Sequence, residues 1–241
     1  MNELNPTTLK KLKRVSTATL TTQLFKRGFR NVYMQGVAPL SRAEDGNMVG
    51  PAFTLRNIPA REDLDKLEVF ADPNCPQRKG VEAIHRGHVL VQDCRGEKGA
   101  ASFGSILITR LKVRGAAGMV SDGPVRDGGV VAALGFPVFC SGASAPLSLV
   151  KHHSVDMNLP IGCGGVAVFP NDVIVGDADG VVVIPCHLTD EIAADAAEQE
   201  GLEEFIRMRV EGGSPLLGTY PPDESTKTAY AEWKERQRPA G

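Results

Sequence analysis

Four polar residues lie close together in the segment GMVSDGPVRDGG, residues 118–129. Ser121, Asp122, Arg126 and Asp127 follow an apolar run, and the neighbouring glycines let a ligand approach the backbone closely. An arginine can hold a carboxylate or an enolate-like oxygen, and an aspartate can hold a hard divalent cation. A charged surface turn uses the same residue types. Because the turn follows a predicted strand, we favour a ligand site with Arg126 and Asp127 as its catalytic residues.

A second glycine element begins the predicted helix that precedes this strand. The N–H groups of a first helical turn lack intrahelical partners, and the helix dipole favours an anion there. Ordinary packing at a helix start is the alternative. If the two elements converge, they bind one small organic acid. The candidate substrate-binding residues are then Gly104, Ser105, Ile106, Leu107 and Arg126.

The composition is that of an ordinary globular protein. The chain has 241 residues, of which 42% are hydrophobic and 23% charged, and its formal net charge is −2. The sequence has no excess of basic residues of the kind that binds nucleic acid, and no apolar run reaches the roughly 18 residues of a membrane helix. We therefore expect a cytoplasmic protein without a nucleic-acid or membrane partner.

The five cysteines are scattered without CxxC spacing, so we expect reduced thiols rather than a disulfide framework. Cys163, in the glycine-rich GCGG, would need a nearby base to act as a nucleophile. His152 and His153 lie about ten residues upstream, but closeness in sequence does not pair them with the thiol. A buried structural role is favoured for this cysteine.

The hydrophobic pattern predicts mixed α/β layers. One or two helices are expected over about 7–28, with a break near Val15, followed by a strand over 48–59 and a short helix over 63–72. Strands and helices then alternate. The expected order is a strand at 88–93, a helix within 99–115, a strand at 116–123, a helix and short strand at 128–142, and hairpins over 164–185.

The C-terminal part is expected to contain a long helix over 188–213, capped at Thr189, and then a polar arm. We assign a single domain to residues 1–211, with its core at about 30–205, and the arm to 212–241. The arm carries apolar groups that must be covered on its own subunit or on a neighbour. These groups are Leu216, Leu217, Tyr220, Tyr230 and Trp233.

Three segments together are similar to the RraA-like family: VLVQD (89–93), FGSILITRLKVRGAAGMVSDGPVRD (103–127) and VGDADGVVVIP (175–185). The family includes 4-hydroxy-4-methyl-2-oxoglutarate aldolases and the regulator of ribonuclease activity A. The similarity extends over about residues 30–205. It implies a compact α/β chain with a β/β/α swivelling-domain-like fold, a C-terminal helix and an arm. It also implies a homotrimer or homohexamer with active sites between subunits.

The resemblance implies a role for each site residue. Asp127 would bind Mg²⁺ or Mn²⁺, largely through a shell of water, and Arg126 would contact the substrate and stabilise an enolate. Backbone N–H groups of residues 105–107 would hold the carboxylate of a pyruvoyl group. An acid from the C-terminal helix of a neighbouring subunit would complete the outer shell of the metal. The candidates for that acid are Glu198, Glu200 and Glu203.

The chain departs from the family pattern at Ser105, where many members have an acidic residue directly after the glycine of the helix start. The surroundings of the metal are therefore altered, and water or another acid such as Asp93 or Asp122 would have to substitute. The arm after about residue 212 resembles the longer members of the family.

The expected function is that of a class II, divalent-metal-dependent pyruvate-type aldolase. It would cleave a small 4-hydroxy-2-oxo acid to pyruvate, or a pyruvate analogue, and a second carbonyl compound. Oxaloacetate decarboxylase activity is expected as well, because both reactions form the same enolate. Since the segment carries no histidine, metal-bound or ordered water would take the hydroxyl proton, and we interpret His85 and His88 as surface or partly buried residues. The alternative is a non-catalytic, protein-binding regulator of ribonuclease E.

Overall fold

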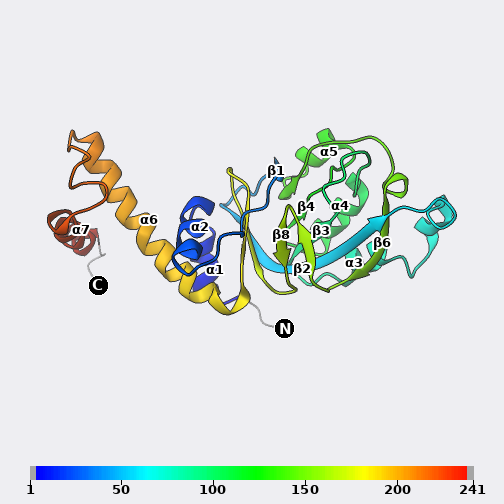
Figure 1. Ribbon diagram of the computed structural model, residues 1–241, viewed down its shortest axis with the longest axis horizontal. Helices are drawn as coiled ribbons and strands as arrows, with labels where there is room; N and C mark the ends of the chain where they lie inside the picture. Colours follow the sequence, from blue (N-terminus) through cyan, green and yellow to red (C-terminus); the bar gives the residue numbers. More distant parts are fainter. Residues whose placement is uncertain (1–3, 238–241) are drawn as a thin grey trace.

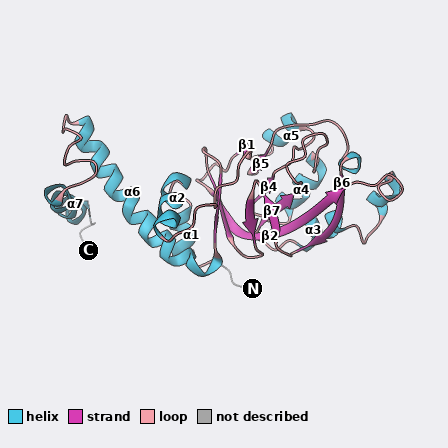
Figure 2. Ribbon diagram, viewed as in Figure 1, coloured by secondary structure: helices cyan, strands magenta, loops and turns pink. Residues whose placement is uncertain are grey.

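The computed structural model describes residues 4–237, and within them eight strands form one curled sheet (Figures 1 and 2). The strand order is β1-β5-β4-β3-β2-β9-β10, and β6 pairs with β2 beside this path. The strands are β1 (Ala38–Ser41), β2 (Met48–Pro59), β3 (Val89–Asp93), β4 (Gly118–Ser121), β5 (Val138–Cys140), β6 (His152–Met157), β9 (Val173–Gly176) and β10 (Val181–Ile184).

Strand β2 joins the two parts of the sheet. Its first four residues pair antiparallel with β9, its middle pairs parallel with β3, and its last five residues pair antiparallel with β6. The sequence VGPAFTL is buried throughout because both faces of this strand are covered. Strands β3, β4 and β5 continue in parallel, so the loops that follow β3 and β4 leave the same edge of the sheet.

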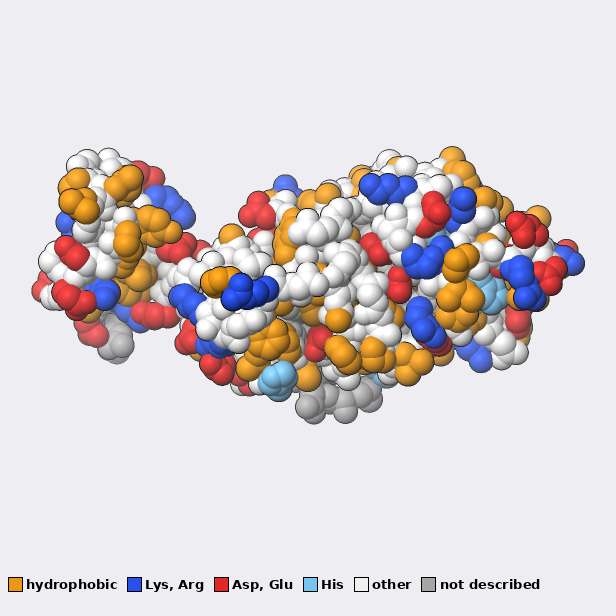
Figure 3. Space-filling model, in the orientation of Figure 1, with side chains coloured by type: hydrophobic (Ala, Val, Ile, Leu, Met, Phe, Trp, Pro, Cys, Tyr) orange, Lys and Arg blue, Asp and Glu red, His pale blue; other side chains and the backbone are white. Residues whose placement is uncertain are grey.

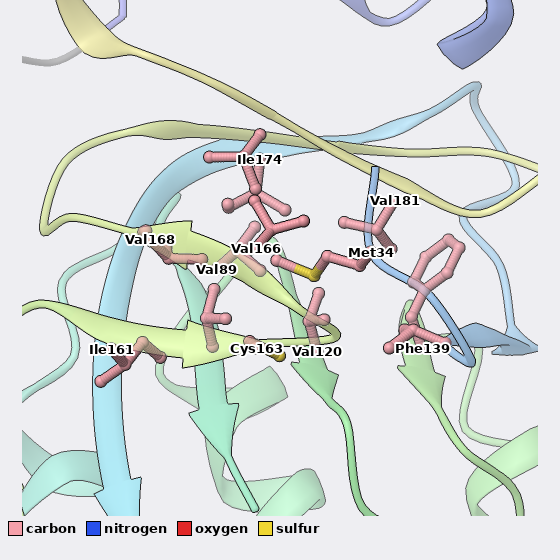
Figure 4. Close-up of a cluster of buried hydrophobic side chains, with 14 of the residues drawn as sticks. Met34, Val89, Val120, Phe139, Ile161, Cys163, Val166, Val168, Ile174 and Val181 are labelled. Atoms are coloured by element: carbon pink, nitrogen blue, oxygen red, sulfur yellow. The ribbon is translucent and has the colours of Figure 1, made fainter. Parts of the chain in front are cut away.

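Layers on the two faces of the sheet make up the β/β/α fold. Helices α3 (Pro76–Ala83), α4 (Ser105–Val113) and α5 (Gly128–Ala132) cover one face, where side chains of the helices such as Ile108 pack on sheet residues such as Leu90. The hairpin β7–β8 (Ile161–Cys163 and Val166–Val168) covers the other face, and Figure 4 shows it against Val89 and Val120. The predicted fold class is therefore confirmed.

The N-terminal helices α1 (Pro6–Leu12) and α2 (Thr17–Lys26) break at the predicted place. The side chain of Ser16 caps α2 by accepting from the Thr19 amide, and Asp177 accepts from both the amide and the hydroxyl of Thr17. The two helices bury leucines against β9, β10 and the long helix α6 (Thr189–Glu211).

Helix α6 extends away from the sheet and carries α7 (Glu224–Gln237) at its far end, as Figures 1 and 3 show. Tyr230 and Trp233 of α7 pack on Phe205 of α6, with ring centroids 5.7 and 5.6 Å from that of Phe205. These two rings are therefore half-buried within their own chain. Leu217 nevertheless remains 94% exposed.

Several local details differ from the predicted elements, and strands β1, β6 and β7 were not predicted. The short helix expected at 63–72 is a 3₁₀ turn, η1 (Leu67–Ala71), and helix α3 was not predicted. The cap expected at Thr189 is also wrong. Leu188 occupies the cap position, and the Thr189 hydroxyl donates to the Cys186 carbonyl oxygen at 3.0 Å. Between residues 4 and 237 no helix is both long enough and apolar enough to cross a membrane.

Candidate functional site

The loop after β3 and the turn after β4 are joined backbone to backbone. Phe103 and Val125 form a parallel bridge, and the Arg126 amide donates to the Phe103 carbonyl oxygen at 2.8 Å. The Ser102 amide donates to the Pro124 carbonyl oxygen, also at 2.8 Å. These bonds place the start of α4 directly beside the Arg126–Asp127 pair, so the two elements converge.

The carboxylate of Asp127 contacts the first residue of α4. Its Oδ2 accepts hydrogen bonds from the Ser105 amide at 3.1 Å and from the Ser105 hydroxyl at 2.8 Å. These two bonds, together with the nearby charge of Arg126, lower the pKa of Asp127, so the carboxylate is ionised at neutral pH. The Ser105 amide, predicted to hold the substrate's carboxylate, is thus engaged by Asp127.

The backbone of Asp127 is in the left-handed region, with φ of 59°. Residues other than glycine adopt this conformation at a cost of roughly 1 kcal/mol or more, although aspartate tolerates it better than most. Such strain concentrates at functional sites. Gly104 also permits the close approach, because a Cβ there would lie 3.3 Å from Asp127 Oδ2 and 3.8 Å from Arg126 Cβ.

These residues border a pocket of about 250 Å³. Gly104, Ile106, Leu107, Arg126 and Asp127 all line it, so four of the five predicted substrate-binding residues lie together with the predicted metal ligand, whereas Ser105 does not line the pocket. The half-buried guanidinium of Arg126 makes no hydrogen bond or salt bridge to any residue from 4 to 237. The pocket therefore holds an arginine that can bind an anionic group of a ligand.

Residues 17–183 match the RraA-like family, described as Aldolase/RraA. The chain belongs to this family. A protein of Halalkalibacterium halodurans, with the provisional name 4-hydroxy-4-methyl-2-oxoglutarate aldolase, is 34% identical over 168 residues, which are 70% of this chain and 73% of that protein.

Solved structures agree with this assignment. Streptomyces coelicolor RraAS2, described as an unusual member of the RNase ES inhibitor RraA protein family, has a TM-score of 0.75 and 32% identity, covering 86% of this chain and 99% of that one. An uncharacterized protein from Pseudomonas syringae has a TM-score of 0.76 at 23% identity, covers 91% of this chain and 100% of that chain, and shows the shared fold.

Two further acids proposed for this RraA-like site lie outside the pocket. The Asp122 carboxylate is buried and accepts from the amides of Cys94, Gly96 and Gly164 at 2.6, 3.0 and 3.4 Å. The Asp93 carboxylate accepts from the Arg95 amide at 2.8 Å, and burial raises its pKa. Both carboxylates hold backbone turns, and neither lines the pocket beside Ser105.

The three candidate glutamates lie on α6, which Figure 1 shows leading away from α4. Glu198 accepts from Tyr230 and Lys234, Glu200 from the amide and hydroxyl of Ser16, and Glu203 from Gln199. None of the three lines the pocket of its own chain.

The donor set fits a weakly coordinated hard cation. Between residues 4 and 237 no three His, Cys, Asp or Glu side chains are grouped so as to enclose a metal ion. Mg²⁺ is commonly bound by one or two carboxylates, with water and substrate oxygens filling its remaining positions. The exposed, ionised carboxylate of Asp127 provides one such ligand.

The thiol of Cys163 is fully buried in the core shown in Figure 4, and burial raises its pKa well above the ordinary value. Burial and the raised pKa favour the structural role predicted for this cysteine over a nucleophilic one. His152 is buried against the Ala100 carbonyl oxygen, and His153 contacts Asp65. His85 and His88 border a separate hollow of about 850 Å³.

Sequence reasoning missed Arg78, Phe70 and Gln77, which also line the pocket. Two of them belong to α3, whose sequence PQRKGVEA is short and mostly polar. Its one local signal is Pro76 at the first helical position, where proline is favoured. Only the packing of α3 against the sheet brings these residues to the site.

Proposed function

We propose that the chain is a divalent-metal-dependent carbon–carbon lyase that cleaves a 4-hydroxy-2-oxo acid to pyruvate and a second carbonyl compound. The observation that carries the proposal is the convergence of Arg126, the ionised Asp127 and the first turn of α4 on one pocket. The provisional aldolase name of the 34% identical relative supports the same reaction class.

The chain's own groups orient the substrate. The carboxylate of the 2-oxo acid binds first-turn amides of α4, and Arg126 lies beside the 2-oxo oxygen. Because the Ser105 amide donates to Asp127, the amides of Ile106 and Leu107 are the first-turn groups that would hold this carboxylate. As the C3–C4 bond breaks, the 4-hydroxyl loses its proton, and the bonding electrons form the enolate of pyruvate. Arg126 stabilises the negative charge on the enolate oxygen, and a proton added at C3 completes pyruvate.

A Mg²⁺ or Mn²⁺ ion held by Asp127 supplies a Lewis acid for the 2-oxo group when it is bound. A water molecule takes the proton of the 4-hydroxyl. None of the five histidines, all of which fall within the described part of the chain, lines the pocket. Asp127 is a weak base because its pKa is lowered. Loss of CO₂ from oxaloacetate yields the same enolate, so decarboxylation is proposed as a companion activity.

We further propose a homotrimer or homohexamer in which an acid of α6 reaches the pocket of a neighbouring subunit. Two observations support this. The three candidate acids lie in the middle of α6, a helix that leads away from the sheet of its own chain (Figure 1), and Ile106, beside the pocket, is 82% exposed. Light scattering should give the mass of three or six chains, and a fully active monomer would contradict the arrangement.

The activity test begins with protein stripped of metal by a chelator. Adding Mg²⁺ or Mn²⁺ should release pyruvate from oxaloacetate, above a blank with the same metal and no protein, and from at least one 4-hydroxy-2-oxo acid. Arg126→Ala and Asp127→Ala should each lower kcat/KM by at least about 100-fold. Arg110→Ala, which removes an exposed arginine from the same helix α4, is the control and should stay near the wild-type rate.

Absence of metal-dependent pyruvate from every substrate would refute the lyase, and an active Asp127→Ala would remove the metal assignment. Regulation of ribonuclease E without catalysis is not favoured, because a regulator has no need for both Arg126 and Asp127 in one pocket. A pull-down with the ribonuclease distinguishes the two functions.

A further inference from the structure

A second arginine, Arg78, lines the same pocket. The guanidinium of Arg78 lies over the ring of Phe70, 4.9 Å from the centroid. Its Nε is buried without a hydrogen-bond partner, and its other nitrogens form no hydrogen bond or salt bridge with residues 4–237. A buried donor normally has a partner, so Arg78 has an unused capacity to bind an anion.

A hydrogen bond of the residue before Arg78 fixes the start of α3 relative to α4. The preceding residue, Gln77, is 4% exposed, and its Nε2 donates to the Ser102 carbonyl oxygen at 2.8 Å. Ser102 lies two residues before Gly104, where α4 begins. The start of α3 is thus tied to the loop that shapes the start of α4, and Phe70 supports the Arg78 side chain from one side.

The charges around the pocket favour an anion with more than one negative group. Arg78 and Arg126 line it, and the one acid in the lining, Asp127, is already bonded to Ser105. Neither α3 nor α4 has an acidic residue in its first turn, so the positive ends of their dipoles are not neutralised within each helix. Apolar side chains, among them Phe103 and Leu107, complete the lining.

We propose that Arg78 binds a second carboxylate, at the far end of the substrate, and makes the site selective for dicarboxylic 2-oxo acids. This rests on the function proposed above, in which the first carboxylate binds at the start of α4. The carbon chain between the two acids lies against the apolar lining. Arginine suits the role because its planar fork matches a carboxylate, and the buried Nε becomes paired.

Arg78 is expected to change affinity rather than the chemical step, because it contacts the end of the substrate away from the 2-oxo group. A purely structural role in packing η1 on α3 would instead change folding stability and affect all ligands alike. The two roles are separated by comparing two ligands of equal length that differ only in the second carboxylate.

The experiment measures binding of 2-oxoglutarate and 2-oxopentanoate by calorimetry in the presence of Mg²⁺. Both have five carbons, and neither is cleaved because each lacks a 4-hydroxyl. The wild type should bind 2-oxoglutarate about 10- to 100-fold more tightly. Arg78→Met should remove most of this preference and leave 2-oxopentanoate unaffected, and Arg78→Lys should restore part of it. Lys79→Met, which removes an exposed neighbouring charge, is the matched control and should keep the preference.

Equal wild-type affinity for the two acids, or an Arg78→Met variant that keeps the preference, would overturn the role of Arg78 while the lyase proposal stands. If neither acid binds, the two-carboxylate site is refuted, and the lyase is decided separately by the release of pyruvate. A preference that depends on Arg78, found in a protein that releases no pyruvate, would keep the two-carboxylate site and refute the lyase.

Discussion

Asp122 should be one of the residues on which the stability of the fold depends most. Its carboxylate is 7% exposed and receives the amides of Cys94, Gly96 and Gly164. These amides belong to two loops far apart in sequence, the turn after β3 and the turn of the β7–β8 hairpin. Replacing Asp122 with alanine leaves three amides without their acceptor.

The magnitude follows from the three bonds. Each hydrogen bond to a charged group contributes about 1.5–3 kcal/mol, and a buried amide without a partner costs a comparable amount. The hydrogen bonds at 2.6 and 3.0 Å should contribute their full free energy to stability, and the one at 3.4 Å should contribute little. We therefore expect Asp122→Ala to lower the free energy of unfolding by about 3–5 kcal/mol. Asp122→Asn should cost less, because its amide oxygen still accepts.

The assay is urea unfolding followed by circular dichroism, at several protein concentrations because subunit association would contribute to stability. Asp63→Ala is the control. It removes an exposed aspartate that pairs with Arg61, and its effect should stay within about 0.5 kcal/mol. A loss below about 1 kcal/mol in Asp122→Ala would refute the role of this carboxylate as the anchor of both loops.

Two predictions concern pH. Ser105→Ala removes the hydrogen bond from the hydroxyl to Asp127 but keeps the one from the amide, so the pKa of Asp127 should rise toward 3.8. The acid limb of the pH profile of kcat/KM should then move to higher pH. An unchanged acid limb would contradict this. Burial lowers the pKa of His152 below its ordinary 6.5, so the unfolded chain binds a proton that the folded chain does not. Stability should therefore fall as pH drops below 6.5 and level off below the folded pKa, and His152→Asn should show a smaller difference between urea unfolding at about pH 7.5 and about pH 5.5.

Much of the site could be predicted from the sequence because its signals are local. The glycine at 104, the Arg126–Asp127 pair and the apolar runs before them predict a helix start and a strand end from neighbouring residues alone. The break between α1 and α2 is also local, since the Ser16 side chain caps α2 by accepting from an amide only three residues further along the chain. Such features depend on backbone conformations that a few consecutive residues determine.

Tertiary structure decided what depends on pairing between distant segments. Asp93 and Asp122 are acids of the right type, but their carboxylates are used by backbone amides that only the folded loops bring near. Arg78 has no motif around it and enters the pocket because Gln77 is bonded to Ser102 across the fold. A side chain's type sets which groups it can bind, whereas the partners that fold around it decide which of them it meets.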